Sequence, residues 1–224
     1  MDIFKFVRTL ENYSHLSNEE ILKLQELYLF DRPLGFLPES IGNLINLKVL
    51  VLSGTKLHSL PESIGKLCNL RRLNLQDNRL DSLPESIVNL SNLQILDLSH
   101  NNLTSLPESI GELSNLQILD LSHNRLDYLP ESIGELSNLQ NLYLSRNQLI
   151  SLPESIANLS KLEKLSLFYN QLNFQAQSVL ETLVMTNSVI TELSTNKFDF
   201  SKELQRNKRK EVAPGRTTLK AVEF

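Results

Sequence analysis

The chain has 224 residues, which is enough to bury a sizeable hydrophobic core. Its net charge of −4 excludes an overall basic surface of the kind that binds nucleic acid. A single cysteine, Cys68, excludes a disulfide framework within the chain and favours a reducing compartment. No apolar stretch approaches the roughly 18 residues that a membrane-spanning helix needs, so we expect no membrane span.

The first predicted elements are two short helices. An apolar stripe with helical spacing predicts a helix over residues 2–12; it consists of Ile3, Phe4, Phe6, Val7 and Leu10. Ser17 and Glu20 have the spacing of a capping box, which predicts a second helix. We expect residues 1–23 to form an N-terminal helical cap over the elements that follow.

A repeat of 23 residues follows. It is marked by a recurring "LPESI" whose prolines are Pro38, Pro61, Pro84, Pro107, Pro130 and Pro153. Seven units of one pattern, LxxLxLxxNxL, alternate with these stretches. They run from "LQELYLFDRPL" (24–34) through "LQILDLSHNNL" (93–103) to "LEKLSLFYNQL" (162–172). Leucines at the fourth and sixth places, such as Leu96 and Leu98, predict a strand with one buried face. Such strands bury that face by stacking in parallel.

This pattern resembles the leucine-rich repeat, and the resemblance covers residues 24–172. It implies an α/β solenoid, a horseshoe with a parallel β-sheet on the concave face, short turns or 3-10 helices on the convex face and helical caps. The units are similar to the intracellular 23-residue class, which includes Ras-pathway scaffold and Scribble-type proteins, plant Ras-group-related repeat proteins and effectors that bacterial pathogens inject into host cells. The resemblance implies a non-enzymatic module that binds a protein on its concave face.

Two recurring features have structural explanations. The ninth-place asparagines fall where the chain leaves each strand, so their amides are expected to form a hydrogen-bonded ladder; they are Asn78, Asn101, Asn124, Asn147 and Asn170. Arg32 and Thr55 occupy this place in the first two units and predict an irregular end. The "LPESI" stretch is the convex return path, and we interpret its glutamates as a solvated stripe.

The period changes after residue 172. An amphipathic helix is predicted within 174–188 and a weak strand within 189–195, which together resemble the longer units of the ribonuclease-inhibitor type. We expect residues 173–200 to form a C-terminal, helix-bearing cap repeat, with Phe198 and Phe200 closing the stack. Residues 201–224 contain seven basic and three acidic residues, and they are expected to form a basic, flexible tail.

Asp, Ser and His recur together in the two central units, which raises a hydrolytic or metal-dependent alternative. Its residues are Asp97, Ser99, His100, Asp120, Ser122 and His123. Adjacent Ser and His at a strand end suggest neither an oxyanion hole nor a nucleophile elbow, and nothing closes a metal coordination shell. Cys68 occupies a place held elsewhere by serine and is interpreted as a small convex-side residue. We therefore expect no catalytic residue, metal or cofactor.

Partner-binding residues are expected on the concave face, where the third, fifth, seventh and eighth places point outward. Aromatic and arginine side chains, which make interface hot spots, gather in the last units. The predicted partner-binding residues are Tyr143, Arg146, Phe168, Tyr169, His123, Asp120 and Arg72. The first unit contributes Tyr28 and Phe30 to the same face. Packing beneath the caps is the alternative for Tyr28, Phe30 and Phe168.

The functional expectation is therefore a monomer that binds a protein and neither spans a membrane nor binds nucleic acid. Small size and the polar tail favour a bacterial effector that acts on a host protein. An endogenous cytoplasmic scaffold is the alternative, and its ending "AVEF" fits a PDZ groove. Either role predicts a cytoplasmic location, which an effector reaches in the host after export without a cleaved signal peptide.

Overall fold

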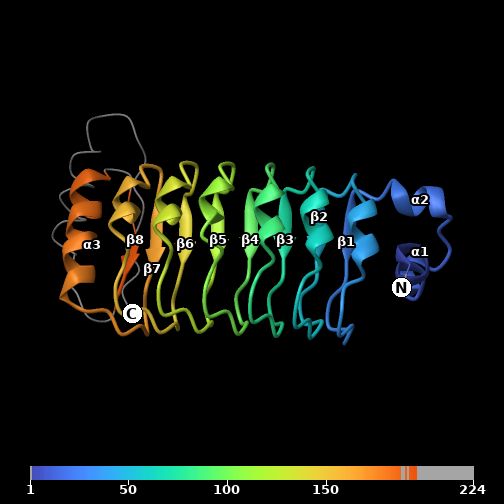
Figure 1. Ribbon diagram of the computed structural model, residues 1–224, viewed down its shortest axis with the longest axis horizontal. Helices are drawn as coiled ribbons and strands as arrows, with labels where there is room; N and C mark the ends of the chain where they lie inside the picture. The colour runs from blue at the N-terminus through green and yellow to red at the C-terminus, as the bar shows by residue number, and fades with distance from the viewer. Residues whose placement is uncertain (1, 188–189, 191, 196–224) are drawn as a thin grey trace.

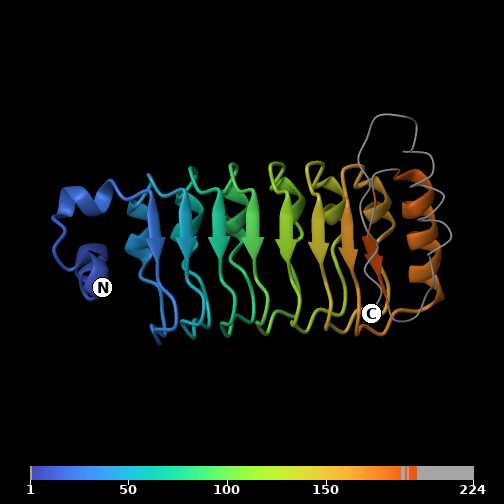
Figure 2. The same ribbon diagram turned by 180° about the vertical axis from the view of Figure 1, so that it is seen from behind.

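The computed structural model describes residues 2–187, 190 and 192–195, so Phe198, Phe200 and the tail at 201–224 lie outside the described residues. One parallel sheet of eight strands runs through the described chain in sequence order. The strands are β1 (Glu26–Tyr28), β2 (Val49–Val51), β3 (Arg72–Asn74), β4 (Ile95–Asp97), β5 (Ile118–Asp120), β6 (Asn141–Tyr143), β7 (Lys164–Ser166) and β8 (Glu192–Ser194). Figures 1 and 2 show the strands side by side, with the short helices on one face of the sheet, behind the strands in Figure 2.

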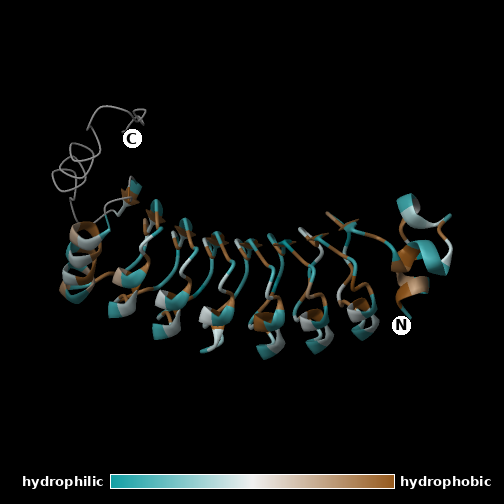
Figure 3. Ribbon diagram, turned by 90° about the horizontal axis from the view of Figure 1, so that it is seen from above, coloured by the Kyte–Doolittle hydropathy of each residue, from teal (hydrophilic) through white to brown (hydrophobic). Residues whose placement is uncertain are grey.

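The convex side carries a 3-10 helix in each of the first six repeats, and α3 (Phe174–Thr186) follows β7 in the seventh. The 3-10 helices are η2 (Glu39–Asn43), η3 (Glu62–Lys66), η4 (Glu85–Asn89), η5 (Ile110–Glu112), η6 (Glu131–Glu135) and η7 (Glu154–Asn158). Seen from above, the sheet lines the inner side of a gentle arc and the 3-10 helices line its outer side (Figure 3). The parallel sheet and the short convex turns confirm the predicted solenoid.

The 23-residue period sets the strand register. Leu50 lies opposite Leu73, and Leu73 lies opposite Leu96 on the next strand, so each fourth-place leucine stacks on the same place in the neighbouring repeat. In the last pairing Leu165 lies opposite Leu193, because the final repeat is longer than 23 residues. A one-residue slip would turn every leucine outward, so the buried face fixes the register.

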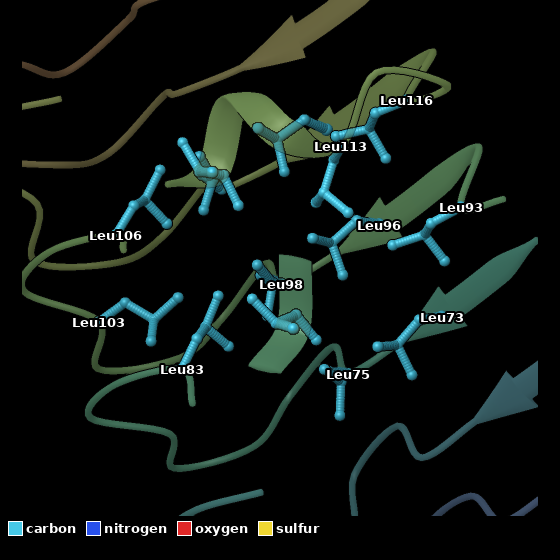
Figure 4. Close-up of a cluster of buried hydrophobic side chains, with 14 of the residues drawn as sticks. Leu73, Leu75, Leu83, Leu93, Leu96, Leu98, Leu103, Leu106, Leu113 and Leu116 are labelled. Atoms are coloured by element: carbon cyan, nitrogen blue, oxygen red, sulfur yellow. The ribbon is translucent and has the colours of Figure 1, made fainter. Parts of the chain in front are cut away.

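The core is a continuous column of leucine and isoleucine between the sheet and the 3-10 helices. Leu96 and Leu98 are fully buried, and Leu103, Leu113 and Leu116 surround them from the neighbouring turns (Figure 4). Complete burial of such a side chain contributes about 1.5–3 kcal/mol. Because each repeat covers the faces of its two neighbours, the end repeats require caps.

A buried asparagine amide joins each repeat to the one before it. Asn101 is typical: its Nδ2 donates to the carbonyl of Leu75 in the preceding repeat and to that of Leu98 in its own, at 2.9 and 3.1 Å. Its Oδ1 accepts from the N–H of Leu80 at 2.9 Å. Asn78, Asn124, Asn147 and Asn170 make the equivalent bonds. These amides satisfy backbone groups that the sheet ladder leaves unpaired.

The first two repeats depart from this arrangement. The Thr55 hydroxyl donates to the Leu52 carbonyl at 2.7 Å and also bonds Oδ1 of Asn78 at 2.9 Å. The N–H of Leu34 is bonded by the backbone carbonyl of Thr55 instead of by a side-chain amide. A hydroxyl has no second donor, so the backbone takes over part of the role of the asparagine.

A second, exposed asparagine series precedes the strands and was not anticipated from the sequence. Asn92 donates from Nδ2 to the carbonyl of Cys68 in the preceding repeat at 2.8 Å. The same bond to the preceding repeat is made by Asn46, Asn69, Asn115 and Asn138. The period-23 recurrence of asparagine just before the first leucine is the sequence signal for this series.

The convex glutamates are not simply a solvated stripe, which corrects the expectation above. Glu39 accepts a hydrogen bond from the N–H of Ser63 in the next repeat at 3.3 Å, and Glu131 does the same for Ser155 at 3.2 Å. Glu62 bonds the N–H of Ser86. These carboxylates therefore link neighbouring turns across the convex surface, in addition to contacting water.

Glycine allows those turns to lie close together. A Cβ built on Gly134 would lie 2.3 Å from the carbonyl oxygen of Ser155, closer than any real contact. Val88 occupies the equivalent place in η4, and the following helix, η5, is only three residues long. There the Ser109 hydroxyl, not its N–H, bonds Glu85 at 3.2 Å. We attribute the local change in η5 to the valine side chain, which requires the next turn to lie further away.

Helices cover the two ends of the described stack. At the front are α1 (Ile3–Arg8), η1 (Glu11–Tyr13) and α2 (Asn18–Leu22), so the predicted helix over 2–12 is divided into an α-helix and a 3-10 turn. Ser17 and Glu20 form the predicted capping box. The Tyr13 hydroxyl accepts from the N–H of Tyr28 in the edge strand at 3.2 Å. At the other end, α3 (Phe174–Thr186) buries Leu180 and Leu183.

Candidate functional site

Each described repeat has a left-handed residue just after its strand, and Lys56 and Gly35 have positive φ as well. The left-handed residue after the strand stands at the eighth place, and its φ is positive in all seven repeats: Asp31, Gly54, Asp77, His100, His123, Arg146 and Tyr169, with values of 54° to 67°. This conformation lets the chain turn away from the sheet while the eighth-place side chain stays on the rim of the concave face. Glycine, asparagine and aspartate adopt it most readily.

Side chains of the last four of these residues contact one another along the rim. The rings of His100 and His123 are stacked, with centroids 3.9 Å apart and planes 17° apart. The guanidinium of Arg146 lies 4.5 Å from the ring centroid of Tyr169. Asp77 bounds the series, its Oδ1 lying 3.8 Å from Nδ1 of His100. We call His100, His123, Arg146 and Tyr169 the αL ridge.

A pair of carboxylates lies on the strands beside this ridge. Asp97 and Asp120 stand opposite each other in β4 and β5, and both are half-buried. Oδ1 of Asp97 accepts from the N–H and the hydroxyl of Ser99, at 3.0 and 2.7 Å. Oδ1 of Asp120 accepts from the N–H of Ser122 at 2.9 Å. These bonds fix the path of the chain as it leaves each strand.

Burial changes the titration of two groups in this region. Desolvation raises the pKa of Asp120, and the Asp97 charge acts in the same direction, while hydrogen bonds from Ser122 oppose the shift. Desolvation also lowers the pKa of His123, and the charges of His100 and Arg146 add to that effect. Both changes favour the neutral forms of these side chains at their positions.

Aromatic side chains gather at the C-terminal end of the face. Tyr143 is half-buried on β6, and its burial raises the pKa of the phenol. Phe168 and Tyr169 follow β7, are 39% and 61% exposed, and contact each other at 6.3 Å between ring centroids. The structure therefore places half-buried Tyr143 and exposed Arg146, Phe168 and Tyr169 on adjacent repeats, and we call these four residues the C-terminal patch.

The other predicted residues lie further along the sheet. His123 and Asp120 belong to the repeat that adjoins the patch, whereas Arg72 lies on β3, with β4 and β5 between it and β6. Tyr28 and Phe30 are 41% and 55% exposed at the opposite end, 6.4 Å apart between ring centroids. Packing beneath the caps does not bury Tyr28, Phe30 or Phe168.

The hydrolytic arrangement has no support in the geometry. The Ser99 hydroxyl donates to Asp97, and the His100 ring stacks on His123 beside Asp77, so serine is not bonded to its neighbouring histidine. A nucleophile requires a base within hydrogen-bond reach. Within the described ranges, no three His, Cys, Asp or Glu side chains are placed to hold a metal ion. Cys68 is exposed and carries a free thiol.

The left-handed column was missed in the sequence. Its signal is the period itself: Asp31, Gly54 and Asp77 at one place of the repeat are residue types that tolerate positive φ. That observation would have identified the same backbone conformation for the larger side chains of the ridge.

Comparison with known proteins agrees with this geometry. A family model described as a leucine-rich repeat region matches residues 4–96, 63–120 and 86–212. The chain therefore belongs to the leucine-rich repeat family, whose domains generally mediate protein–protein interaction. The search of curated proteins gave no match.

Solved structures of leucine-rich repeat proteins are similar to the chain. A leucine-rich repeat protein of Leptospira interrogans is 37% identical with a TM-score of 0.74, and the match covers 85% of this chain and 49% of that one. The ectodomain of a membrane receptor kinase from Arabidopsis thaliana, in complex with Casparian strip integrity factor 2, is 38% identical with a TM-score of 0.63 and covers 67% of this chain and 19% of the receptor chain. The chain thus spans about half of the first and a fifth of the second.

A third solved structure shares the fold alone. The functional domain of InlJ from Listeria monocytogenes is 21% identical with a TM-score of 0.69, and the match covers 85% of this chain and 40% of that one. Separately, none of the helices in the described ranges combines the length and apolar character needed to cross a membrane.

Proposed function

We propose that this chain is a non-enzymatic module that docks a partner protein on its concave face at the C-terminal patch. The observation that carries the proposal is the clustering of Tyr143, Arg146, Phe168 and Tyr169 on adjacent repeats, with Tyr169 and Phe168 exposed. Tyrosine and arginine are enriched among the residues that dominate interface energies, and a single such anchor contributes about 2 kcal/mol or more.

The rigidity of the face supports the same proposal. β6 and β7 are paired in register, and the buried amides of Asn147 and Asn170 hold the turns that follow them. A side chain displayed on such a framework loses little further conformational freedom when it binds, so more of its contact energy appears as affinity. The leucine-rich repeat ectodomain of the plant receptor kinase, solved with a bound factor, is a related case of binding by this fold.

The test is partner capture by the intact protein and two double variants. Tyr143→Ala with Phe168→Ala removes the aromatic anchors, and we expect it to abolish capture from a eukaryotic lysate while the melting temperature stays nearly unchanged. Glu108→Lys with Glu112→Lys reverses charge on the convex side as the control and is expected to retain capture. Glu85 is avoided in the control because its carboxylate holds Ser109.

Two outcomes contradict the proposal. If the convex variant loses the partner and the aromatic variant still captures it, the partner docks on the convex side. Unfolding of the aromatic variant assigns Tyr143 and Phe168 to the core of the cap. A milder pair, Tyr143→Ser with Phe168→Gln, keeps the test usable because both positions are partly exposed.

For the biological setting we propose a monomeric bacterial effector that binds its partner in the cytoplasm of a host cell. A bacterial relative, the leucine-rich repeat protein of Leptospira interrogans, matches 85% of this chain and supports this setting. Identification of the captured protein by mass spectrometry separates this setting from an endogenous scaffold, because an effector captures a host protein, whereas a scaffold captures a protein of its own cell. We also propose residues 1–23 and 173–200 as the caps of the solenoid.

A further inference from the structure

Two residues of the αL ridge, Arg146 and Tyr169, have a left-handed backbone conformation that is unfavourable for their residue types. Their φ values are both 58°. Aspartate or glycine at the same place, as in Asp31, Gly54 and Asp77, would make this turn at lower cost. Neither side chain is buried, so core packing does not offset the cost. Strained positions that persist are concentrated at functional sites, and that points to a role for these side chains outside folding.

Arg146 is the outward-facing charge of this part of the face. Its guanidinium is exposed and is held against the ring of Tyr169, so its direction is set before any partner arrives. Among the described residues no carboxylate lies within ion-pair distance of it. Asp97 and Asp120 on β4 and β5 are half-buried. One carboxylate oxygen of each accepts a hydrogen bond from the backbone N–H of Ser99 or Ser122, just after the strand. A guanidinium presented in this way matches a carboxylate, which it binds through two parallel hydrogen bonds.

Two stacked histidines continue the ridge beyond Arg146. Their ring centroids are 3.9 Å apart, and Oδ1 of Asp77 lies 3.8 Å from Nδ1 of His100. Burial, with the charges of His100 and Arg146, lowers the pKa of His123 and so favours its neutral form. We therefore assign the carboxylate of a partner to Arg146.

We propose that the αL ridge binds an acidic, extended segment of the partner protein, with a carboxylate of that segment on Arg146. This inference rests on the proposed function, because the ridge includes two residues of the C-terminal patch. It adds the chemistry of the partner. Charge complementarity supplies specificity and orientation, while the aromatic anchors supply most of the affinity.

The experiment selects peptides without knowledge of the natural partner. A random phage-displayed library of linear peptides is panned against the intact protein at pH 6, and the enriched sequences are synthesised. We expect enrichment in Asp and Glu. Arg146→Gln should weaken a selected peptide by about tenfold, the scale of a lost charge-assisted hydrogen bond. Arg125→Gln, at an exposed arginine on the turn after the preceding strand, is the matched control and should leave affinity unchanged.

Several results overturn the inference. They are enrichment of neutral or basic sequences, failure to select any peptide, and insensitivity to Arg146→Gln. The selected peptides can lack acidic residues and still fail to bind the Tyr143→Ala, Phe168→Ala variant of the protein. That result contradicts the acidic chemistry of the partner but not the docking face. Acidic peptides that are insensitive to both the aromatic and the arginine variants contradict the docking face as well.

Discussion

The side-chain amide of Asn124 donates a 2.9 Å hydrogen bond to the backbone carbonyl of Leu98, which lies in the preceding repeat. The same amide bonds the carbonyl of Leu121 at 3.0 Å, and its oxygen accepts from the N–H of Leu103 at 3.0 Å. One buried side chain thus satisfies three backbone groups in two repeats. Because those groups have no other partner in the sheet ladder, the repeat interface depends on the asparagine.

Replacement of Asn124 by leucine should therefore destabilise the fold by about 1–3 kcal/mol, since the buried N–H of Leu103 loses its partner. The carbonyls of Leu98 and Leu121 each lose one hydrogen bond but keep those from Asn101 and Asn147. Asn115→Leu is the control in the exposed series, where Nδ2 bonds the Ser91 carbonyl at 2.8 Å in contact with solvent. Water replaces that bond, so the control should cost much less. Urea denaturation measures both variants. Equal losses would show that burial does not distinguish the two series.

A second prediction concerns the close approach of convex turns. Gly134→Val places a side chain where a Cβ alone would lie 2.3 Å from the Ser155 carbonyl oxygen, so the next turn must move. The expected loss is about 1–3 kcal/mol, the usual cost of overpacking. Calorimetry of the variant measures it.

The natural valine at the equivalent place provides the reverse test. Val88→Gly should allow the following turn to lengthen from the three residues of η5 toward the five of its neighbours. A crystal structure of this variant in which η5 is unchanged would show that Val88 is not the cause of the irregular turn.

The regular part of the fold was predictable because one physical requirement repeats every 23 residues. Leucines such as Leu96 and Leu98 alternate with polar residues, which predicts strands, and a constant period predicts parallel strands in register. The period also reveals a polar residue that recurs at one buried place of the repeat. The hydrogen bonds of Asn101 to the backbone explain why that residue is polar.

What the sequence did not reveal depends on geometry between repeats. The bond from the buried Ser63 to the exposed Glu39 joins polar residues 24 positions apart, and hydrophobic periodicity does not indicate it. The stack of His100 on His123 requires the left-handed backbone at both residues, and that conformation follows from turn geometry. The C-terminal patch was predicted from residue type, and its role in binding stays a prediction.

The C-terminal cap offers a further prediction. Asn173 caps α3: its Oδ1 accepts from the N–H groups of Gln175 and Ala176, at 2.9 and 3.1 Å. Asn173→Ala should lower stability by about 1 kcal/mol, the usual effect of losing an N-cap, whereas Asn173→Ser should recover most of it. Hydrogen exchange of the α3 amides checks the effect locally. Unchanged protection in the alanine variant would mean that packing of the helix, not its cap, holds it in place.

The last prediction uses the raised pKa of Asp120. Burial, with a smaller contribution from the Asp97 charge, raises the pKa of this carboxyl above its ordinary value. The folded state therefore prefers the protonated form, and the contribution of Asp120 to stability is present at low pH and is lost as pH rises through its folded pKa. Asp120→Asn removes that loss, so it should raise the free energy of unfolding at pH 7. The gain should shrink as pH falls through the folded pKa of Asp120 and should vanish below about 4, where aspartate in the unfolded chain is also protonated.

Asparagine suits this place because Asn74, at the equivalent position of β3, accepts from the N–H of Gln76 at 3.0 Å, as Asp120 does from Ser122. Urea denaturation of the wild type and the variant across pH 3 to 8 measures the difference, with Asp127→Asn as an exposed control that should show little gain at any pH. A gain for Asp120→Asn that stays constant down to pH 3 would contradict the explanation by charge, because an uncharged carboxyl and an amide would then differ for a reason other than ionisation.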